Sequence, residues 1–137
     1  MSIRLRAATF VALSLFVGCS SSSSVSGKIT FDGNPLTSGT ATFHPVGQGP
    51  AGIGSIGSDG RYQISVGTSK SLPPGEYVIT VESFEPLEAE KRDAQGRLMA
   101  PKAPKRITPD RYADKDSTDL RTTIKSGDAV VDLELKK

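Results

Sequence analysis

Few side chains in this sequence are of types that do chemistry, and they lie far apart along the chain. The 137 residues include a single cysteine, Cys19, and a single histidine, His44. Three aspartates, Asp114, Asp116 and Asp119, are close enough in sequence to suggest a cation site. A thiolate is a nucleophile, an imidazole is a base near neutral pH, and carboxylates are the ligands that calcium prefers. Each of these groups needs partners of the right type, and the sequence can be searched for them.

The histidine and the aspartates lack such partners. His44 falls on the polar side of an expected strand, and no second histidine or thiol completes a tetrahedral zinc set with it. We expect a strand residue that faces solvent. The aspartate segment lacks the central glycine and distal glutamate of an EF-hand, so its carboxylates are expected to satisfy nearby backbone groups. These patterns predict no metal, no cofactor and no catalytic residue, and the chain is expected not to be an enzyme.

The cysteine follows a segment that is typical of a signal peptide. Arg4 and Arg6 precede an apolar run over residues 7–17, and Val17 and Gly18 supply small residues before Cys19. The apolar run is too short to cross a bilayer, which takes about 20 residues. Residues 1–18 are therefore expected to be removed by cleavage between Gly18 and Cys19.

Phe16, Val17, Gly18 and Cys19 resemble the lipobox of bacterial lipoproteins, with phenylalanine where leucine is usual. The resemblance implies that the Cys19 thiol carries diacylglycerol and that the new amine receives a fatty acyl chain such as palmitate. It also implies, through Ser20, a site in the cell envelope on the outer membrane, facing the periplasm. Residues 19–24 would then be the lipidated cysteine and a serine-rich tether.

Cleavage also changes the charge balance. The whole chain has 17 Lys+Arg and 15 Asp+Glu, and removing Arg4 and Arg6 leaves 15 of each. A neutral domain lacks the basic surface that nucleic-acid binding requires. We therefore expect no nucleic-acid partner, and the membrane is the partner that the lipid on Cys19 implies.

The rest of the chain alternates apolar and polar residues with a period of two, which is typical of half-buried strands. Seven short segments show this pattern: VSGKITF, SGTATFHP, AGIGSIGS, RYQISV, EYVITVESF, LRTTIK and AVVDLEL. Long helical patterns between them are missing, so a parallel sheet is not expected. The fold class that the pattern predicts is all-β, an antiparallel sandwich over residues 25–137.

An insert at about 85–118 breaks the alternation, with mixed charges and several prolines. Its first part is compatible with a short helix that places Leu87, Lys91 and Ala94 near one face. A loop of this length is either a solvated flexible segment or a functional one. If it contacts a partner, the candidate residues are Glu85, Arg97, Lys105 and Tyr112.

The strands and turns together resemble a carboxypeptidase-regulatory-like, or transthyretin-like, domain. The residues that carry the resemblance are turn and core positions: Gly27, Asp32, Gly33, Pro35, Leu36, Phe43, Asp59, Gly60, Tyr62, Pro74, Gly75 and Tyr77. The resemblance implies a seven-stranded Greek-key sandwich of the prealbumin type, with a short helix after the fifth strand. It implies little about activity, because a fold does not determine a function.

The expected function is that of a non-catalytic, membrane-anchored lipoprotein that acts as a binding or scaffolding module for an envelope protein. The contact would use the insert or an exposed edge strand. One alternative is a surface carbohydrate-binding module, which the absence of tryptophan weakens. Another is a hydrolase of the transthyretin-like type, whose histidine cluster has no match in a chain with one histidine.

Overall fold

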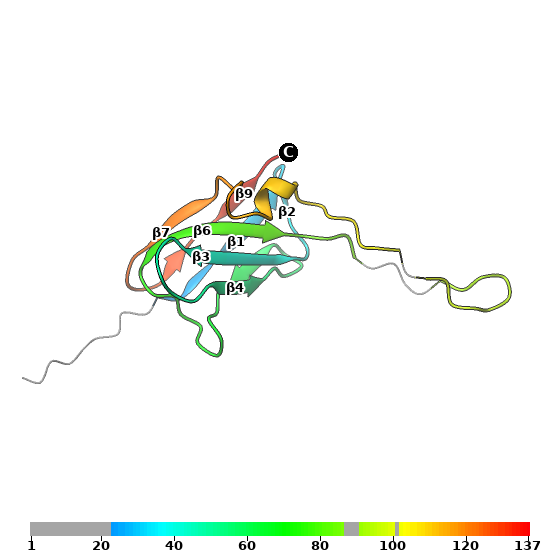
Figure 1. Ribbon diagram of the computed structural model, residues 1–137, viewed down its shortest axis with the longest axis horizontal. Coiled ribbons are helices and arrows are strands. Elements are labelled where there is room, and N and C mark those ends of the chain that lie inside the picture. Colours follow the sequence, from blue (N-terminus) through cyan, green and yellow to red (C-terminus); the bar gives the residue numbers. More distant parts are fainter. Residues whose placement is uncertain (1–22, 87–90, 101) are drawn as a thin grey trace, which may run out of the picture.

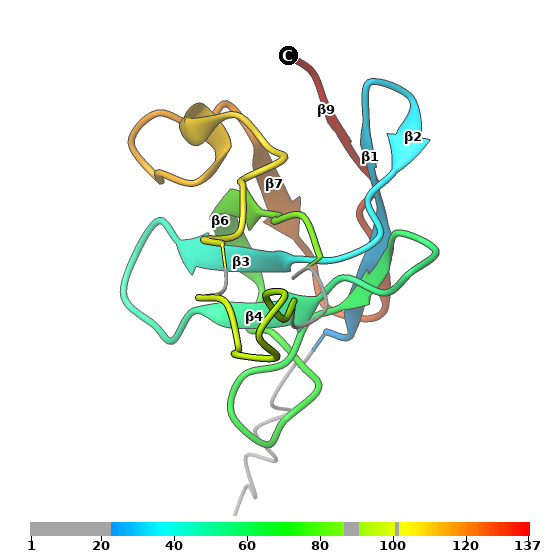
Figure 2. The same cartoon turned by 90° about the vertical axis from the view of Figure 1, so that its right-hand side faces the viewer.

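The computed structural model describes residues 23–86, 91–100 and 102–137. These residues form two β-sheets that face each other, with a long arm extending from one end (Figure 1). Figure 2 shows the two layers from the side of the arm, with β1 and β9 in one layer and β3, β4, β6 and β7 in the other. The described residues include no helix long and apolar enough to cross a membrane.

The first sheet is built around β1 (Val25–Phe31). One edge of β1 pairs antiparallel with two short strands, β2 (Asn34–Pro35) and β5 (Arg61–Gln63). The other edge pairs parallel with the end of the chain, in β8 (Ala129–Val130) and β9 (Leu133–Leu135). The amino- and carboxyl-terminal segments therefore run side by side in one sheet.

The second sheet is antiparallel throughout, in the order β4, β3, β6, β7. Its strands are β4 (Gly52–Ser55), β3 (Thr40–Pro45), β6 (Gly75–Glu82) and β7 (Arg121–Ile124). A short 3₁₀-helix, η1 (Asp110–Tyr112), lies between β6 and β7 in the sequence. The all-β prediction is thus confirmed. The sheets are rich in antiparallel pairs, but β8 and β9 run parallel to β1, which differs from the antiparallel sandwich that the alternation predicted.

The core lies between the sheets and is filled by the apolar face of each alternating strand. Phe43 lies at its centre, with its ring 6.0 Å from that of Tyr62 and 6.2 Å from that of Tyr77. Both tyrosine hydroxyls donate to backbone carbonyls, those of Val131 and Pro73 respectively. Burial raises the pKa of both phenols, and Asp132 raises the pKa of Tyr62 further. These hydrogen bonds allow the two polar rings to be buried without an unpaired hydroxyl.

The last expected strand, AVVDLEL, is split into β8 and β9. The break falls at Val131 and Asp132. The Val131 carbonyl accepts a hydrogen bond from the Tyr62 hydroxyl, and the Asp132 carboxylate accepts one from the backbone N–H of Lys28. Gly27 makes the break possible, because a Cβ there would lie 2.0 Å from the carbonyl oxygen of Val131. Side-chain hydrogen bonds replace ladder bonds at this point, which a period-two pattern does not reveal.

The helix expected at the start of the insert does not form in the residues described there, and Leu87 lies outside them. Arg92 and Leu98 instead form an antiparallel bridge around a turn that contains Gly96, at φ 78°. The Asp93 carboxylate accepts the backbone N–H groups of Gln95 and Arg97, both 2.9 Å away. An aspartate that bonds the following N–H groups favours a turn over a helix, which explains the difference.

Candidate functional site

The expected lipidation site, Cys19, and the expected cleavage site between Gly18 and Cys19 lie outside the described residues. The expected signal peptide, residues 1–18, lies outside them too. The first described residue is Ser23, four positions after Cys19, and it is fully buried. Ser23 exchanges backbone hydrogen bonds with Leu72, at 3.0 and 2.8 Å. Its hydroxyl donates to the carbonyl of Lys125, so three bonds hold the residue at its place.

Ser24 is held in a similar way. Its carbonyl accepts the N–H of Ala129 at 2.8 Å, and its hydroxyl donates to the Asp128 carboxylate at 2.6 Å. The sequence assigned residues 19–24 to the lipidated cysteine and a serine-rich tether, and the structure places the last two of them, Ser23 and Ser24, in the folded domain. Serine hydroxyls suit a linker as well as a strand end, so composition alone does not separate the two roles. Only residues 20–22 then separate Cys19 from the folded domain.

The described residues of the insert, 83–86, 91–100 and 102–107, pair as an antiparallel hairpin, which we call the arm. At its base the N–H of Ile107 donates to Ser83 and the N–H of Glu85 donates to Lys105, both at 2.8 Å. Phe84 and Arg106 form the bridge between these two bonds. The strand β6 therefore continues into the arm, whose other side returns to the sandwich.

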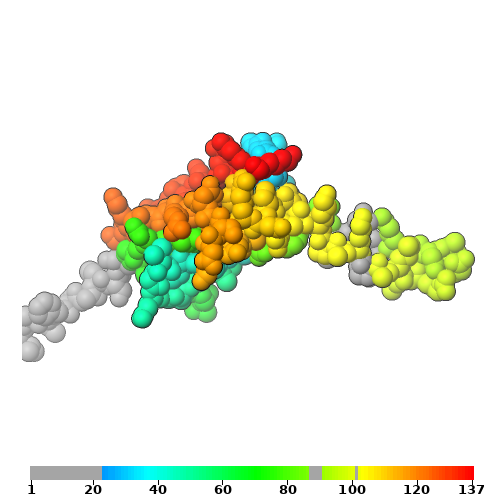
Figure 3. Space-filling view, turned by 45° about the horizontal axis from the view of Figure 1, so that its top comes forward, coloured from blue at the N-terminus to red at the C-terminus, as the bar shows by residue number. Residues whose placement is uncertain are grey.

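The distal part of the arm keeps the register of its base. The N–H of Met99 donates to Lys91 at 2.8 Å, and Arg92 is bridged to Leu98. Going from the Glu85–Lys105 pair to the Lys91–Met99 pair takes six residues on each side of the arm. The base and the distal part therefore share one pairing register. Figures 1 and 3 show the described part of the arm standing well away from the sandwich.

The structure separates the four contact residues that the sequence suggested. Glu85 and Lys105 face each other at the base of the arm, with Nζ 3.9 Å from Oε1. Arg97 lies at the tip, where its Nε donates to Asp93 at 2.8 Å and where its hydrogen bonds hold the pKa of the Asp93 carboxyl below its usual value. Two of the four are therefore neighbours, and the third lies at the far end.

The fourth residue, Tyr112, belongs to the core. Its side chain is 3% exposed in η1, and its hydroxyl accepts the N–H of Lys136 at 3.1 Å. The Arg111 guanidinium covers the ring at 4.7 Å. Tyr112 therefore closes the end of the sandwich beside β9, and its assignment to a contact surface is corrected.

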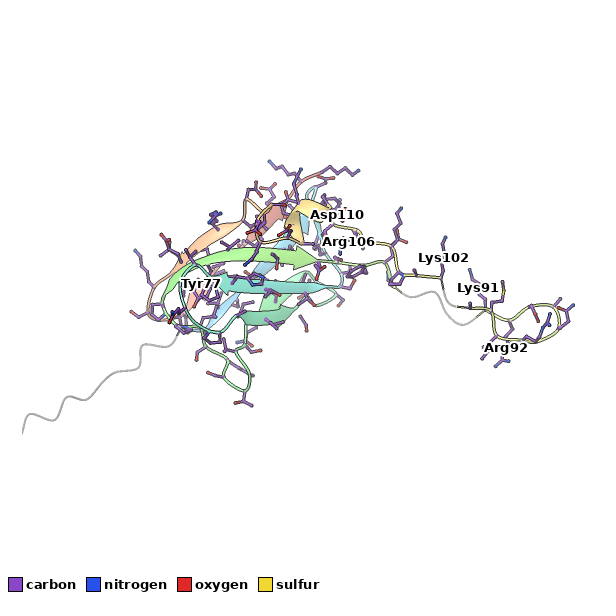
Figure 4. The ribbon with its side chains drawn as sticks, in the orientation of Figure 1. Tyr77, Lys91, Arg92, Lys102, Arg106 and Asp110 are labelled. Atoms are coloured by element: carbon purple, nitrogen blue, oxygen red, sulfur yellow. The ribbon has the colours of Figure 1, made fainter. Side chains whose placement is uncertain are left out.

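Arg106 holds the base of the arm in place, a role that the sequence did not reveal. Its guanidinium donates to Glu82 at 3.0 Å and to Asp110 at 2.7 Å, and it lies 5.4 Å from the centre of the Phe84 ring. It thereby ties the returning side of the arm to the end of β6 and to η1, and Figure 4 shows Arg106 close to Asp110. The pair with Glu82 depends on the fold and leaves no sequence signal.

The arm combines exposed apolar side chains with basic ones. Leu98 and Met99 are 57% and 56% exposed near its tip. Lys91, Arg92 and Lys102 lie along it (Figure 4). Large apolar side chains on a projecting hairpin are typical of contact surfaces, because nothing in the sandwich covers them.

His44 and the aspartates lie where the sequence predicted. The Nε2 atom of His44 is 3.0 Å from the Oγ1 atom of Thr80, on the outer face of the second sheet. The Asp114 carboxylate accepts the N–H of Asp116 at 2.9 Å, which is the local backbone bond expected for this segment. Within residues 23–86, 91–100 and 102–137, no three acidic, histidine or cysteine side chains are grouped as metal ligands.

Comparisons with known proteins give little support for any assignment. No family model and no curated protein matches the chain. A solved structure that matches is that of a 9R-lipoxygenase from Cyanothece, at 13% identity and a TM-score of 0.37. The match covers 94% of this chain and 18% of the lipoxygenase, so the chain spans less than a fifth of that protein.

The expectation that the chain is not an enzyme is withdrawn, since the solved structure that matches is by its title a lipoxygenase. A likeness with a TM-score below 0.5 carries no argument for lipoxygenase activity in this chain. We therefore assign neither a catalytic activity nor its absence. A function can be proposed from two features, the arm and the hydrogen bonds that hold Ser23 to Leu72 and Lys125, which we call the clamp on Ser23.

Proposed function

We propose that the mature chain is a lipid-anchored lipoprotein of the cell envelope, facing the periplasm from the outer membrane. In this role it is a binding or scaffolding module that contacts an envelope protein through the arm. The observation that carries the proposal is the single register of the arm, which makes a loop-like sequence into a projecting hairpin with Leu98 and Met99 exposed.

The anchor is proposed from the sequence around Cys19 together with the position of Ser23. A lipid on Cys19 would be joined to the folded domain through residues 20–22 alone, and Ser23 is held by the backbone of Leu72 and by the carbonyl of Lys125. Two or more acyl chains give stable anchoring, whereas one gives only marginal membrane binding. The diacylglycerol and acyl chain that a lipobox implies would therefore hold the domain at the membrane.

For the sandwich we propose the seven-stranded Greek-key arrangement of transthyretin-like domains. Counting β8 and β9 as one interrupted strand, and β2 as an extension of the turn after β1, leaves seven strands. The chain crosses between the sheets after β1, after β4, after β5 and after β7. Such crossings, with the last strand parallel to the first, support the proposed arrangement.

The arm is suited to contact because of its position and its chemistry. The strand β6 begins at Gly75, beside Ile124 and the clamp on Ser23, and ends at Glu82, where the arm begins. The seven steps from the first to the last residue of β6 place its two ends about 23 Å apart, from the rise per residue of a strand. The arm therefore starts at the end of the sandwich away from the anchor, where a protein in the periplasm can reach it.

The test places a photo-crosslinking amino acid at Leu98 in the full chain, expressed in the bacterial cells that process it. The expected result is a discrete crosslinked protein, identified by mass spectrometry. The matched control carries the same amino acid at Ser55, an exposed residue of the edge strand β4, and is expected to lack that adduct. An adduct pattern that is the same at both positions would contradict a specific role for the arm.

A further inference from the structure

We propose that the end of the sandwich around Ser23 is the surface that rests on the phospholipid bilayer, so that the domain stands end-on and the arm points away from the membrane. The surface consists of three loops, residues 46–51, 67–72 and 125–128, which we call the anchor-end loops. This inference rests on the proposed function, because it needs a lipid on Cys19.

The first argument is the length of chain between the lipid and the fold. Four steps from Cys19 to Ser23 span at most about 14 Å when fully stretched. Ser23 is fully buried and bonded to Leu72 and Lys125, so the domain cannot release further chain without losing these bonds. The anchor-end loops are thus held within a short distance of the lipid surface.

The second argument is that the anchor-end loops lie together around Ser23. Loop 67–72 ends at Leu72, which exchanges backbone bonds with Ser23, and loop 125–128 begins at Lys125, which accepts the Ser23 hydroxyl. Loop 46–51 starts at Val46, whose N–H donates to Glu76 at the start of β6. Figure 4 places Tyr77, which follows Glu76, at the end of the second sheet away from the arm.

The third argument is the chemistry of this end. Lys70 and Lys125 are exposed on two of the loops. Val46, on the third loop, and Val130, two residues after loop 125–128, are exposed apolar residues, with Val130 exposed by 76%. The Asp128 carboxylate accepts the Ser24 hydroxyl. Exposed lysines beside exposed apolar side chains suit the boundary between phosphate headgroups and acyl chains.

The arm provides the contrast that makes the orientation testable. It leaves the sandwich after Glu82, at the opposite end of β6, and its tip turn lies further out still (Figure 1). A domain standing on the anchor-end loops keeps that tip far from the bilayer. A domain lying on its side brings the tip and the loops equally close to it.

The experiment uses the full chain, processed in bacterial cells and reconstituted in vesicles of phosphatidylethanolamine and phosphatidylglycerol. A fluorophore is attached in turn through Lys70→Cys, Ser126→Cys and Gln95→Cys, the last at the tip of the arm. Nitroxide on the lipid headgroups then quenches any fluorophore that lies near the membrane surface. The intact mass of each protein reports separately whether Cys19 carries lipid.

The expected result is loss of most fluorescence at positions 70 and 126 and an unchanged signal at position 95. Equal quenching at all three positions, or stronger quenching at position 95, in a protein whose mass shows the lipid would overturn the end-on orientation and leave the anchor in place. A mass without lipid on Cys19 would overturn the orientation together with the proposed function.

Discussion

The backbone N–H of Glu85 donates to the carbonyl of Lys105, and their side chains also approach each other, with Nζ 3.9 Å from Oε1. This pair marks the point where the sandwich ends and the arm begins. The chain leaves the sandwich beside Glu85 and returns to it beside Lys105, so the arm is an addition to the fold and not one of its strands.

Replacing residues 86–104 by Asn-Gly should therefore leave the sandwich folded. Glu85 and Lys105 are already paired, and Asn-Gly is the preferred two-residue turn for such a pair. Closing a shorter loop costs less conformational entropy. We therefore expect the free energy of unfolding, measured in urea, to be unchanged or higher. The crosslink described for Leu98 cannot form in this variant, and loss of partner capture with an intact fold would locate binding in the arm. A variant that fails to fold would contradict the separation of arm and sandwich.

Arg106→Lys should weaken the base of the arm. A single ammonium group cannot reach Glu82 and Asp110 as the guanidinium does, so we expect a loss of about 1 kcal/mol in the free energy of unfolding. High salt should reduce the difference. Lys105→Ala is the matched control, because its ion pair is long and exposed, and it should change stability by less than about 0.5 kcal/mol. Equal effects of the two substitutions would argue against the special role of Arg106.

The tip of the arm should lose its order in acid. Hydrogen bonds from Arg97 and Gln95 hold the pKa of Asp93 below its usual value. A lowered pKa in the folded state means that the turn is fully stabilised above the unfolded value of about 4 and loses this contribution as the pH falls through the lower, folded value. The amide resonances of Gln95 and Arg97 should shift toward random-coil positions over that range, while those of the core do not. Asp93→Asn should abolish the titration.

Gly27→Ala should be among the most destabilising changes in the first sheet. The added Cβ would lie 2.0 Å from the Val131 oxygen, which is backbone and cannot swing away, so β1 would be forced from the last strand. We expect a loss of about 3 kcal/mol in urea unfolding. Gly47→Ala is the control, since nothing lies within 4 Å of its Cβ position, and its stability should match the parent or exceed it slightly.

Ser23→Ala tests whether the residue is part of the fold. It removes the buried hydroxyl that donates to Lys125 and keeps the backbone bonds to Leu72, so the expected loss is about 1 kcal/mol. Ser24→Ala, whose hydroxyl bond is exposed, should cost less than about 0.5 kcal/mol. An unchanged unfolding midpoint for Ser23→Ala would show that the Ser23 hydroxyl does not stabilise the fold, and Ser23 would then be better described as part of the tether.

The strands could be predicted from the sequence because each is half buried, so its inward side chains alternate. Phe43, Tyr62 and Tyr77 are found facing the core as that pattern requires. The turn at Gly60, with φ 80°, is likewise read from the Asp-Gly pair before the next strand. Local rules of this kind need no knowledge of the tertiary structure.

The arm could not be predicted in the same way, because most of its described residues beyond the base are exposed and no alternation is required of them. Its register follows from Ser83 and Ile107, whose pairing depends on the sandwich. The burial of Tyr112 and the clamp on Ser23 also come from segments distant in sequence, at Lys136 and Lys125. Residues that pair locally were predictable, and residues whose partners lie far along the chain were not.

The two prolines of the arm base have a consequence for neighbouring copies of this protein. Pro86 follows Glu85 and Pro104 precedes Lys105, so the register places them opposite each other on the two strands of the arm. An exposed ribbon normally offers its outer N–H groups to any neighbouring strand, which is how edge-to-edge aggregates start. Neither proline has an N–H group, and each interrupts the edge on which a second arm would have to pair. Neighbouring copies of the protein can therefore expose their arms without edge-to-edge pairing and aggregation.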